Sequence, residues 1–268
     1  VERTTPKTTT RLTLQVSDME GKAGYGDLQV MIGTYGERRV AWVQGGDVAS
    51  ALAACDDGVA DTLGFSTAAG FDAEALPPAS MIGPSVRGVV AIYMHGVDVS
   101  AASDYSELEF LALHDFSGRI DLSRLTSLEC LRLDWSKGVV LPGSQVPLRS
   151  LHMHGYKPVS RDLSDLPMWP NLEELELVKG GVESLSGVSA FRGLKKISLS
   201  YSPRLESIEE ISALTFLEEI EFDHCARVAS FDAVGHLNEV SALKINHCGT
   251  IPSVDFVAGL SKLKHFSF

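Results

Sequence analysis

A histidine followed directly by a cysteine occurs twice near the end of the sequence, in the stretches "DHC" at 223–225 and "NHC" at 246–248. Imidazole and thiolate groups are preferred zinc ligands, and a structural zinc site takes four of them. The same residues also fit a second interpretation, in which one structural position recurs in each unit of a repeated fold. The choice depends on whether the surrounding sequence repeats.

The surrounding sequence does repeat. Nine segments share the pattern apolar-x-x-apolar-x-apolar, and successive segments start 19 to 24 residues apart. The nine segments are "VVAIYM" (89–94), "LEFLAL" (108–113), "LECLRL" (128–133), "LRSLHM" (148–153), "LEELEL" (172–177), "LKKISL" (194–199), "LEEIEF" (217–222), "VSALKI" (240–245) and "LKHFSF" (263–268). The pattern resembles that of the leucine-rich repeat family, whose unit is a short strand followed by a turn and a helical or extended return.

Each unit has the physical features of such a repeat. Apolar residues at the fourth and sixth positions alternate with polar ones, which is typical of a strand with one buried face. The returns carry apolar residues about every three positions, as in Ile208, Ile211 and Leu214, which fits a short helix. One unit cannot bury its own apolar face, so units stack. We therefore predict an α/β solenoid over 89–268, with about nine parallel strands on the concave face and short helical or 3-10 returns on the convex side.

The repeat also gives the two cysteines a structural role. Cys225 and Cys248 both occupy the ninth position of their repeats, where the leucine-rich repeat family places Asn or Cys at the turn that leaves the strand. The resemblance therefore implies buried turn thiols stacked one repeat apart, and we favour this interpretation over a zinc site.

Residues 1–88 show no such repeat. After a threonine-rich start, 1–10, that we expect to be mobile, three stretches read as strands: "RLTLQV" (11–16), "LQVMIG" (28–33) and "RRVAWVQ" (38–44). The last two are joined by "TYGE", a plausible hairpin, and Asp47 then begins a helix in "GGDVASALAAC". The segment 64–88 is rich in Gly, Pro and Ala and reads as a connector. We interpret 1–88 as an N-terminal α/β cap or small subdomain, because solenoids need their ends covered.

Composition narrows the class of partner. The net charge of -12 argues against a nucleic-acid or anionic-membrane surface and favours a basic partner. No apolar run approaches the roughly 18 residues that a membrane-spanning helix needs, and the first residues lack the apolar stretch of a signal peptide. Four cysteines in 268 residues are too few for a disulfide scaffold. A cytoplasmic location fits these features best.

The third, fifth and seventh positions of each strand point away from the core, onto the concave face. On the first four strands these positions and their neighbours gather histidines with aromatic and charged residues. The candidate protein-binding residues of this region are Tyr93, Phe110, His114, Arg132, Asp134, Trp135, His152 and His154. Aromatic and Arg anchors beside His and Asp are typical of protein interfaces.

The same region admits two other interpretations. Metal-dependent activity at a cluster of His95, His114 and His154 is one, because imidazole with carboxylate suits zinc or nickel. A catalytic acid/base set is the other. Neither has a motif spacing, and no nucleophile or glycine loop stands in a known relation to the cluster. We therefore assign no catalytic residue, no metal ligand and no cofactor.

A second region of the predicted concave face is acidic. Its members lie on the fifth to seventh repeat strands, with Lys196 between them: Glu174, Glu176, Glu219, Glu221 and Asp223. A solvated sheet face is one interpretation. However, like charges opposite each other on adjacent strands are destabilising, and a basic partner would relieve that repulsion.

The function that the resemblance implies is non-catalytic binding of another protein by the concave face. One specific form is an inhibitory or immunity-type protein that neutralises a basic toxin or nuclease. An alternative is a structural or scaffold role through homo-association. The sequence ends in "KHFSF" (264–268), inside the ninth strand, and an open sheet edge invites strand pairing. We therefore expect either a homodimer or a docked partner at this C-terminal edge strand.

Overall fold

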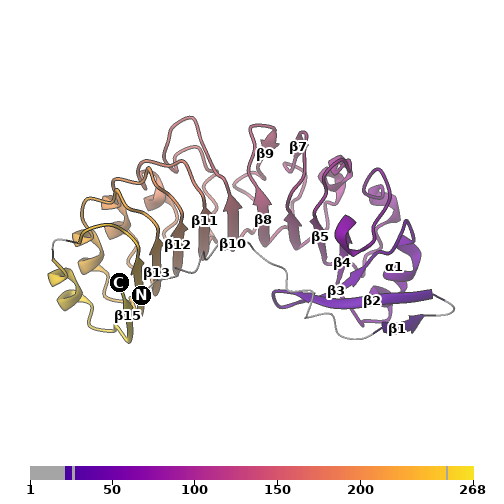
Figure 1. The fold of residues 1–268 in the computed structure, drawn as a ribbon, viewed down its shortest axis with the longest axis horizontal. Coiled ribbons are helices and arrows are strands. Elements are labelled where there is room, and N and C mark those ends of the chain that lie inside the picture. The colour runs from indigo at the N-terminus through magenta and orange to yellow at the C-terminus, as the bar shows by residue number, and fades with distance from the viewer. Residues whose placement is uncertain (1–21, 26–27, 252) are drawn as a thin grey trace, which may run out of the picture.

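A single sheet of thirteen strands forms the frame of the molecule, in the order β1-β2-β3-β4-β5-β6-β8-β10-β11-β12-β13-β14-β15. It is seen in a computed structural model that describes residues 22–25, 28–251 and 253–268. The sheet curves into an arc with its strands on the inner side (Figure 1). The predicted mobile start, 1–10, and the predicted strand at 11–16 lie outside the described residues.

All nine repeat strands are present, and eight of them begin at the third position of the predicted repeat. The exception is β5, whose Gly88 pairs with the third-position Phe110 of β6, so the predicted register of the first repeat is wrong by three residues. They are β5 (Gly88–Ile92), β6 (Phe110–Leu113), β8 (Cys130–Asp134), β10 (Ser150–His154), β11 (Glu174–Val178), β12 (Lys196–Ser200), β13 (Glu219–Asp223), β14 (Ala242–Asn246) and β15 (His265–Ser267). Neighbouring strands pair in parallel with equivalent positions opposite each other, as in Leu175 with Ile197 and Ile197 with Ile220. The predicted leucine-rich repeat solenoid is therefore confirmed.

The apolar positions of the repeat form one continuous core. Leu175, Ile197 and Ile220 are at most 1% exposed, and the cluster to which they belong runs from Val30 to Leu260. Each repeat buries its apolar side chains against those of the next, which no single repeat achieves alone. The polar residues between them are left on the concave face.

The returns on the convex side are mostly short 3-10 helices, as predicted. They are η4 (Ser100–Asp104), η5 (Val188–Ala190), η6 (Glu209–Ala213), η7 (Asp232–His236) and η8 (Asp255–Gly259). The returns after β6 and β8 instead contain two-residue strands, β7 (Ile120–Asp121) and β9 (Val139–Val140), which pair in parallel. None of the helices in the described part of the chain is long and apolar enough to span a bilayer.

The longest return, 155–173, has no helix, although all of its residues are described. It contains three prolines, which lack the N–H that a helix interior needs. A fully buried Trp169 fills the space inside this return. Its ring stacks against Phe191 at 6.4 Å and its Nε1–H donates to the Gly143 carbonyl at 3.1 Å.

The N-terminal region continues the same sheet. Strands β1 (Lys22–Tyr25), β2 (Leu28–Tyr35) and β3 (Arg38–Trp42) are antiparallel, and Gly36 turns the predicted hairpin with φ +60°. Asp47 is the N-cap of helix α1 (Val48–Asp56), and its side chain accepts a hydrogen bond from the Ser50 backbone N–H. These features confirm the predicted hairpin and helix.

One prediction for this region is wrong. Residues 64–66, read as part of a connector, belong to strand β4 (Thr62–Ser66), which pairs in parallel with β3 and with β5. Every residue of β4 is buried. Thr62, Gly64 and Ser66 are small or polar, and the segment therefore did not read as a core strand. The division of the chain at residue 88 stays a prediction, and the sheet is continuous across it.

The hairpin of β2 and β3 curls over the concave face at this end of the arc (Figure 1). Val40 and Trp42 pack against Ile92 and Phe110 in a second apolar cluster, separate from the main core. A side chain at Gly64 would meet the Trp42 ring at 2.5 Å, so glycine is needed for this approach. The concave surface of β5 and β6 is therefore covered by the protein itself.

The continuous core makes a stability prediction. Truncating Leu175 to alanine should leave a cavity between β10 and β12 and lower the free energy of unfolding by about 2–5 kcal/mol. Glu174→Ala, on the same strand but on the concave face, should change it by less than about 0.5 kcal/mol. Denaturant unfolding of the two variants measures the difference. Equal losses would contradict the assignment of the buried face.

Candidate functional site: the concave face

The strand register arranges the concave-facing side chains of β10 to β14 in three columns, in which His152 and Ser198 are buried. The third-position column contains Ser150, Glu174, Lys196, Glu219 and Ala242. The fifth-position column contains His152, Glu176, Ser198, Glu221 and Lys244. The seventh-position column contains His154, Val178, Ser200, Asp223 and Asn246.

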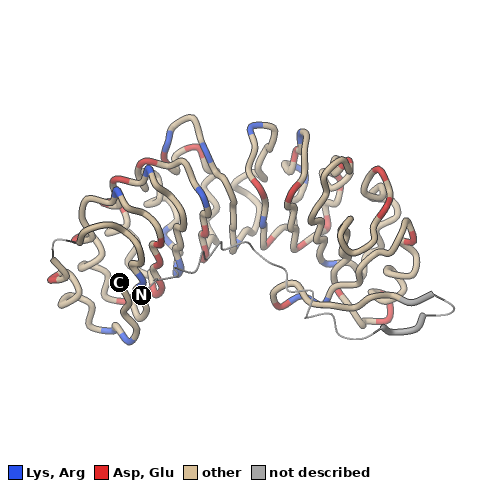
Figure 2. Tube along the Cα trace, in the orientation of Figure 1, with Lys and Arg blue, Asp and Glu red and all other residues tan. Residues whose placement is uncertain are grey.

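The acidic residues of these columns do not face one another directly, which corrects the expected repulsion. Strand β12 separates β11 from β13, so Lys196 lies between Glu174 and Glu219. Its Nζ is 3.9 Å from Glu219 Oε2. Acidic and basic positions are accordingly interleaved along the arc (Figure 2). The sheet therefore tolerates its carboxylates without a partner.

In the fifth-position column, too, another residue separates the acidic side chains. Ser198 stands between Glu176 and Glu221, and Lys244 Nζ lies 3.7 Å from Glu221 Oε2. Exposed ion pairs of this kind contribute little to stability. Side-chain exposures of 43% for Glu176 and 35% for Glu221 leave both carboxylates open to a ligand.

A histidine–carboxylate network lies beside the acidic columns. His114 Nδ1 is 3.0 Å from Asp134 Oδ1, and the Asp115 backbone N–H donates to Asp134 Oδ2 at 2.7 Å. Burial tends to raise the pKa of Asp134, but these hydrogen bonds outweigh it and hold the pKa below its ordinary value. His154 Nδ1 lies 3.7 Å from the same carboxylate. Burial nevertheless lowers the pKa of His154, against the attraction of Asp134.

The centre of the concave face holds two groups with unsatisfied polar atoms. His152 is only 6% exposed, and its Nδ1 approaches Glu176 Oε2 at 2.9 Å without hydrogen-bond geometry. This contact with His152 lowers the pKa of Glu176 against the effect of burial. Arg132, with a buried Nε that has no hydrogen-bond partner, places its guanidinium 6.0 Å from the Tyr35 ring. Burial raises the pKa of Tyr35 to about 12, against the positive charge of Arg132.

Three of the predicted contact residues are buried or partly buried and not open to a partner. Phe110 is 5% exposed because the hairpin residue Tyr35 covers it, with ring centroids 6.0 Å apart; its prediction as a contact residue is wrong. His152 is likewise buried. Trp135 is partly buried against the main core and packs on Tyr156 at 5.1 Å. Tyr93 is 37% exposed, but it lies at the left-handed turn after β5, with φ 56°, and not on the strand as predicted; its role as a contact residue stays a prediction.

The structure does not bring His95, His114 and His154 together as metal ligands. His95 is exposed on the turn after β5, and Asp134 is already hydrogen-bonded by His114 and Asp115. Over the described ranges, a single set of three or more potential ligands has its atoms within 4.8 Å of one another. That set is Asp223, His224 and His247.

The thiols of the two His-Cys pairs point away from their histidines. Cys225 and Cys248 are 0% and 4% exposed, and each sulfur lies 3.4 Å from a core carbonyl, of Leu199 and Phe222 respectively. The contact with Cys248, together with burial, raises the pKa of Cys225. The prediction of buried turn thiols is confirmed, and a zinc site using all four residues is geometrically excluded.

Sequence reasoning missed a stack of rings just outside the seventh-position column. Tyr201, His224 and His247 lie at the eighth position of consecutive repeats, with ring centroids 4.4 Å and 4.3 Å apart. All three have left-handed backbone conformation, with φ of 53° to 54°. The signal in the sequence was the recurrence of large rings at one repeat position, which the three columns did not include.

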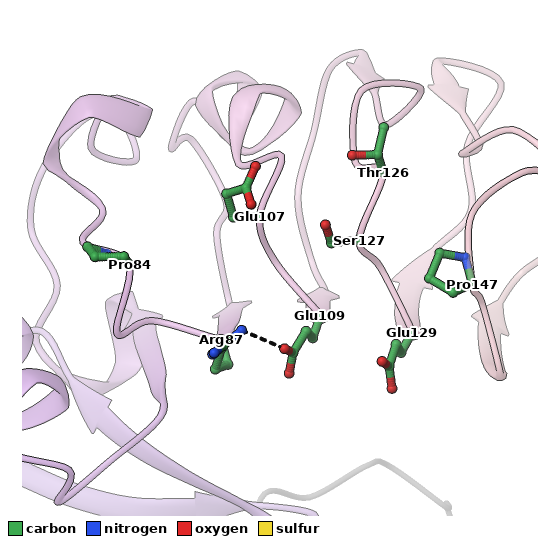
Figure 3. Close-up of a pocket in the computed structure, with 8 residues that line it drawn as sticks. All are labelled: Pro84, Arg87, Glu107, Glu109, Thr126, Ser127, Glu129 and Pro147. Carbon is green, nitrogen blue, oxygen red and sulfur yellow. Dashed lines mark hydrogen bonds and ion pairs between the residues drawn. The ribbon is translucent and has the colours of Figure 1, made fainter.

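A groove also lies at the edge where the strands begin, between β5 and β10 (Figure 3). It has a volume of about 560 Å³ and is lined by Pro84, Arg87, Glu107, Glu109, Thr126, Ser127, Glu129 and Pro147. The cation that lines it, Arg87, already pairs with Glu109 at 2.8 Å. None of the residues that line the groove has a buried polar atom without a hydrogen-bond partner. The lining therefore does not point to a particular ligand.

No protein-family model matches the sequence, and no curated protein matches it. Solved structures of leucine-rich repeat proteins do match. One is a leucine-rich repeat protein of Leptospira interrogans, 16% identical with a TM-score of 0.64 over 84% of this chain and 58% of that one. Another is the leucine-rich repeat domain of the type III effector XopL, 14% identical with a TM-score of 0.59 over 81% and 79%.

An internalin of Listeria monocytogenes is 15% identical with a TM-score of 0.50, over 83% of this chain and 70% of that one. This chain spans only 58% of the length of the Leptospira protein, which is less than two thirds. Sequence identities this low support a statement about fold alone. The chain has the leucine-rich repeat fold.

The histidine network predicts a pH dependence of stability. Because the pKa of His154 is lowered in the folded protein, the unfolded chain binds more protons as pH falls through the ordinary histidine value of about 6.5. The free energy of unfolding should therefore decrease from pH 7 to pH 5, and decrease again below about pH 4 as Asp134, whose pKa is also lowered, becomes protonated.

Denaturant unfolding across this range tests the effect. His154→Gln should flatten the slope between pH 5 and pH 7 relative to the wild type, whereas His95→Gln, at an exposed turn, should leave it unchanged. Identical slopes for His154→Gln and the wild type would show that His154 does not contribute.

Proposed function

We propose that the protein is a non-catalytic binding module that recognises another protein through the concave face of β10 to β14. The observation that carries the proposal is the set of open side-chain columns on these strands. Glu219 and Glu176 have side-chain exposures of 57% and 43% on a sheet whose other face is fully packed. Rigid strands hold these groups in fixed relative positions, which favours recognition over induced rearrangement.

The charge of the face favours a basic partner. The columns of β10 to β14 carry five carboxylates and two lysines, an excess of three negative charges within the net charge of -12 of the chain. A concave acidic surface concentrates the field and attracts cationic partners, which raises association rates about 10- to 1,000-fold at low salt. Neutralisation of a basic toxin or nuclease is one form that this proposal can take.

The size of the face sets a requirement on the partner. Five strands about 4.8 Å apart and five residues long span roughly 20 Å by 16 Å, which is less than the roughly 800 Å² per partner of a standard interface. The partner must therefore also contact neighbouring parts of the arc. One such part is the β2–β3 hairpin, whose Tyr35 lies 6.0 Å from the guanidinium of Arg132 on β8, the strand next to β10.

Charge reversal tests the proposal. The partner is first captured from the source proteome, and its binding to the purified protein is then measured at several salt concentrations. Glu176→Lys with Glu221→Lys should slow association about tenfold or more and flatten its salt dependence, because steering depends on these charges.

The matched control makes the same charge change on the convex side. Glu209→Lys with Asp232→Lys alters exposed residues of η6 and η7 and should leave association within about twofold of the wild type, since these charges face away from the concave columns. If both double variants slow association equally, only net charge matters and the concave face is not the site.

A further inference from the structure

The repeat turn brings two imidazoles and a carboxylate together at the end of β13. Asp223 is the last residue of β13, and His224 and His247 follow β13 and β14 at equivalent positions. The left-handed turn is a property of the repeat, since Asp115 and Lys179 have it as well. It turns the eighth-position side chains of successive repeats onto one another. In these two repeats the result is a pair of stacked imidazoles beside a carboxylate.

The three ligand atoms converge on a small space. His224 Nδ1 and His247 Nδ1 lie 2.9 Å and 3.1 Å from the same oxygen, Asp223 Oδ1. In a tetrahedral zinc site with bonds of about 2.0–2.1 Å, neighbouring ligand atoms are about 3.3 Å apart. Room for an ion therefore needs an outward shift of a few tenths of an ångström of each nitrogen from this oxygen. It also needs a turn of the exposed His247 ring, now stacked on His224 at 4.3 Å, toward the common point.

One of the three groups is incompletely satisfied as it stands. His247 Nδ1 has hydrogen-bond geometry toward Asp223, whereas the buried Nδ1 of His224 has no hydrogen-bond partner. A buried polar atom without a partner costs about 1–3 kcal/mol. A cation between the nitrogens and the carboxylate would satisfy that atom, whereas in the present geometry Asp223 Oδ1 is hydrogen-bonded by His247 and not by His224.

We propose that Asp223, His224 and His247 form a binding site for a divalent transition-metal ion such as Zn²⁺. Two imidazoles and one carboxylate are a ligand set that suits zinc and its first-row neighbours. The adjacent thiols take no part, because Cys225 and Cys248 are buried with their sulfurs against core carbonyls. The side chain of His247 is 69% exposed, so water or a partner's side chain completes the coordination.

The site lies where the concave face meets the turn side of the arc, next to the acidic columns. Tyr201 stacks on the outer face of His224 at 4.4 Å and restricts rotation of that ring. Such packing pre-organises a ligand and limits the entropy lost on binding. The proposal does not depend on the proposed protein partner.

Zinc binding to the full chain tests the proposal. After removal of metal with a chelator, titration with Zn²⁺ alone should show one ion bound per chain. His224→Asn and His247→Asn keep a residue type that tolerates the left-handed turn. Each should weaken binding at least about tenfold, since changes even in groups that only support a ligand typically weaken binding about 10- to 100-fold.

The second histidine cluster supplies the matched control. His114→Asn removes an imidazole that also contacts an aspartate and should leave zinc affinity unchanged. Histidine NMR spectra of the wild type provide a readout independent of variant folding, and the ring signals of His224 and His247 should shift on addition of Zn²⁺. No stoichiometric binding, or binding lost in His114→Asn and kept in His224→Asn, would overturn the proposal.

Discussion

The stacking of apolar side chains at the fourth and sixth positions of each repeat is the constraint on which the rest of the structure depends. Because strand side chains alternate between two faces, a slip of one residue would expose the whole apolar set. The core therefore holds equivalent positions of neighbouring strands opposite one another, as for Leu175 and Ile197. The polar columns of the concave face and the turn that follows each strand inherit that alignment.

The regular part of the fold was predictable because its signal is local and repeated. The apolar patterns placed eight strands in the right register and the ninth, β5, three residues away from it, and the ninth-position cysteines were correctly placed in the core. The N-terminal hairpin was also predictable in outline, but its path was not. Contacts of Tyr35 with Phe110 and Arg132 join segments far apart in the sequence. Phe110 therefore looked like an exposed anchor although the chain covers it.

The candidate site shows why order along the chain and neighbourhood in space must be kept apart. Glu174 and Glu219 looked like repelling neighbours, yet β12 places Lys196 between them. The ring stack was hidden for a different reason. Left-handed turns usually favour Gly or Asn, so His224 and His247 gave no local sign of that conformation. Once the turn is known, their stacking follows from the distance between neighbouring strands.

Carboxylate footprinting of the protein with and without its captured partner tests most directly whether recognition takes place on the concave columns. Carbodiimide labelling of exposed carboxylates, read by mass spectrometry, should fall on Glu176, Glu219 and Glu221 in the complex. Labelling of the convex Glu209 should not change. Protection confined to the convex side or to the β2–β3 hairpin would contradict the account, because the open columns would then be a solvated surface without a recognition role.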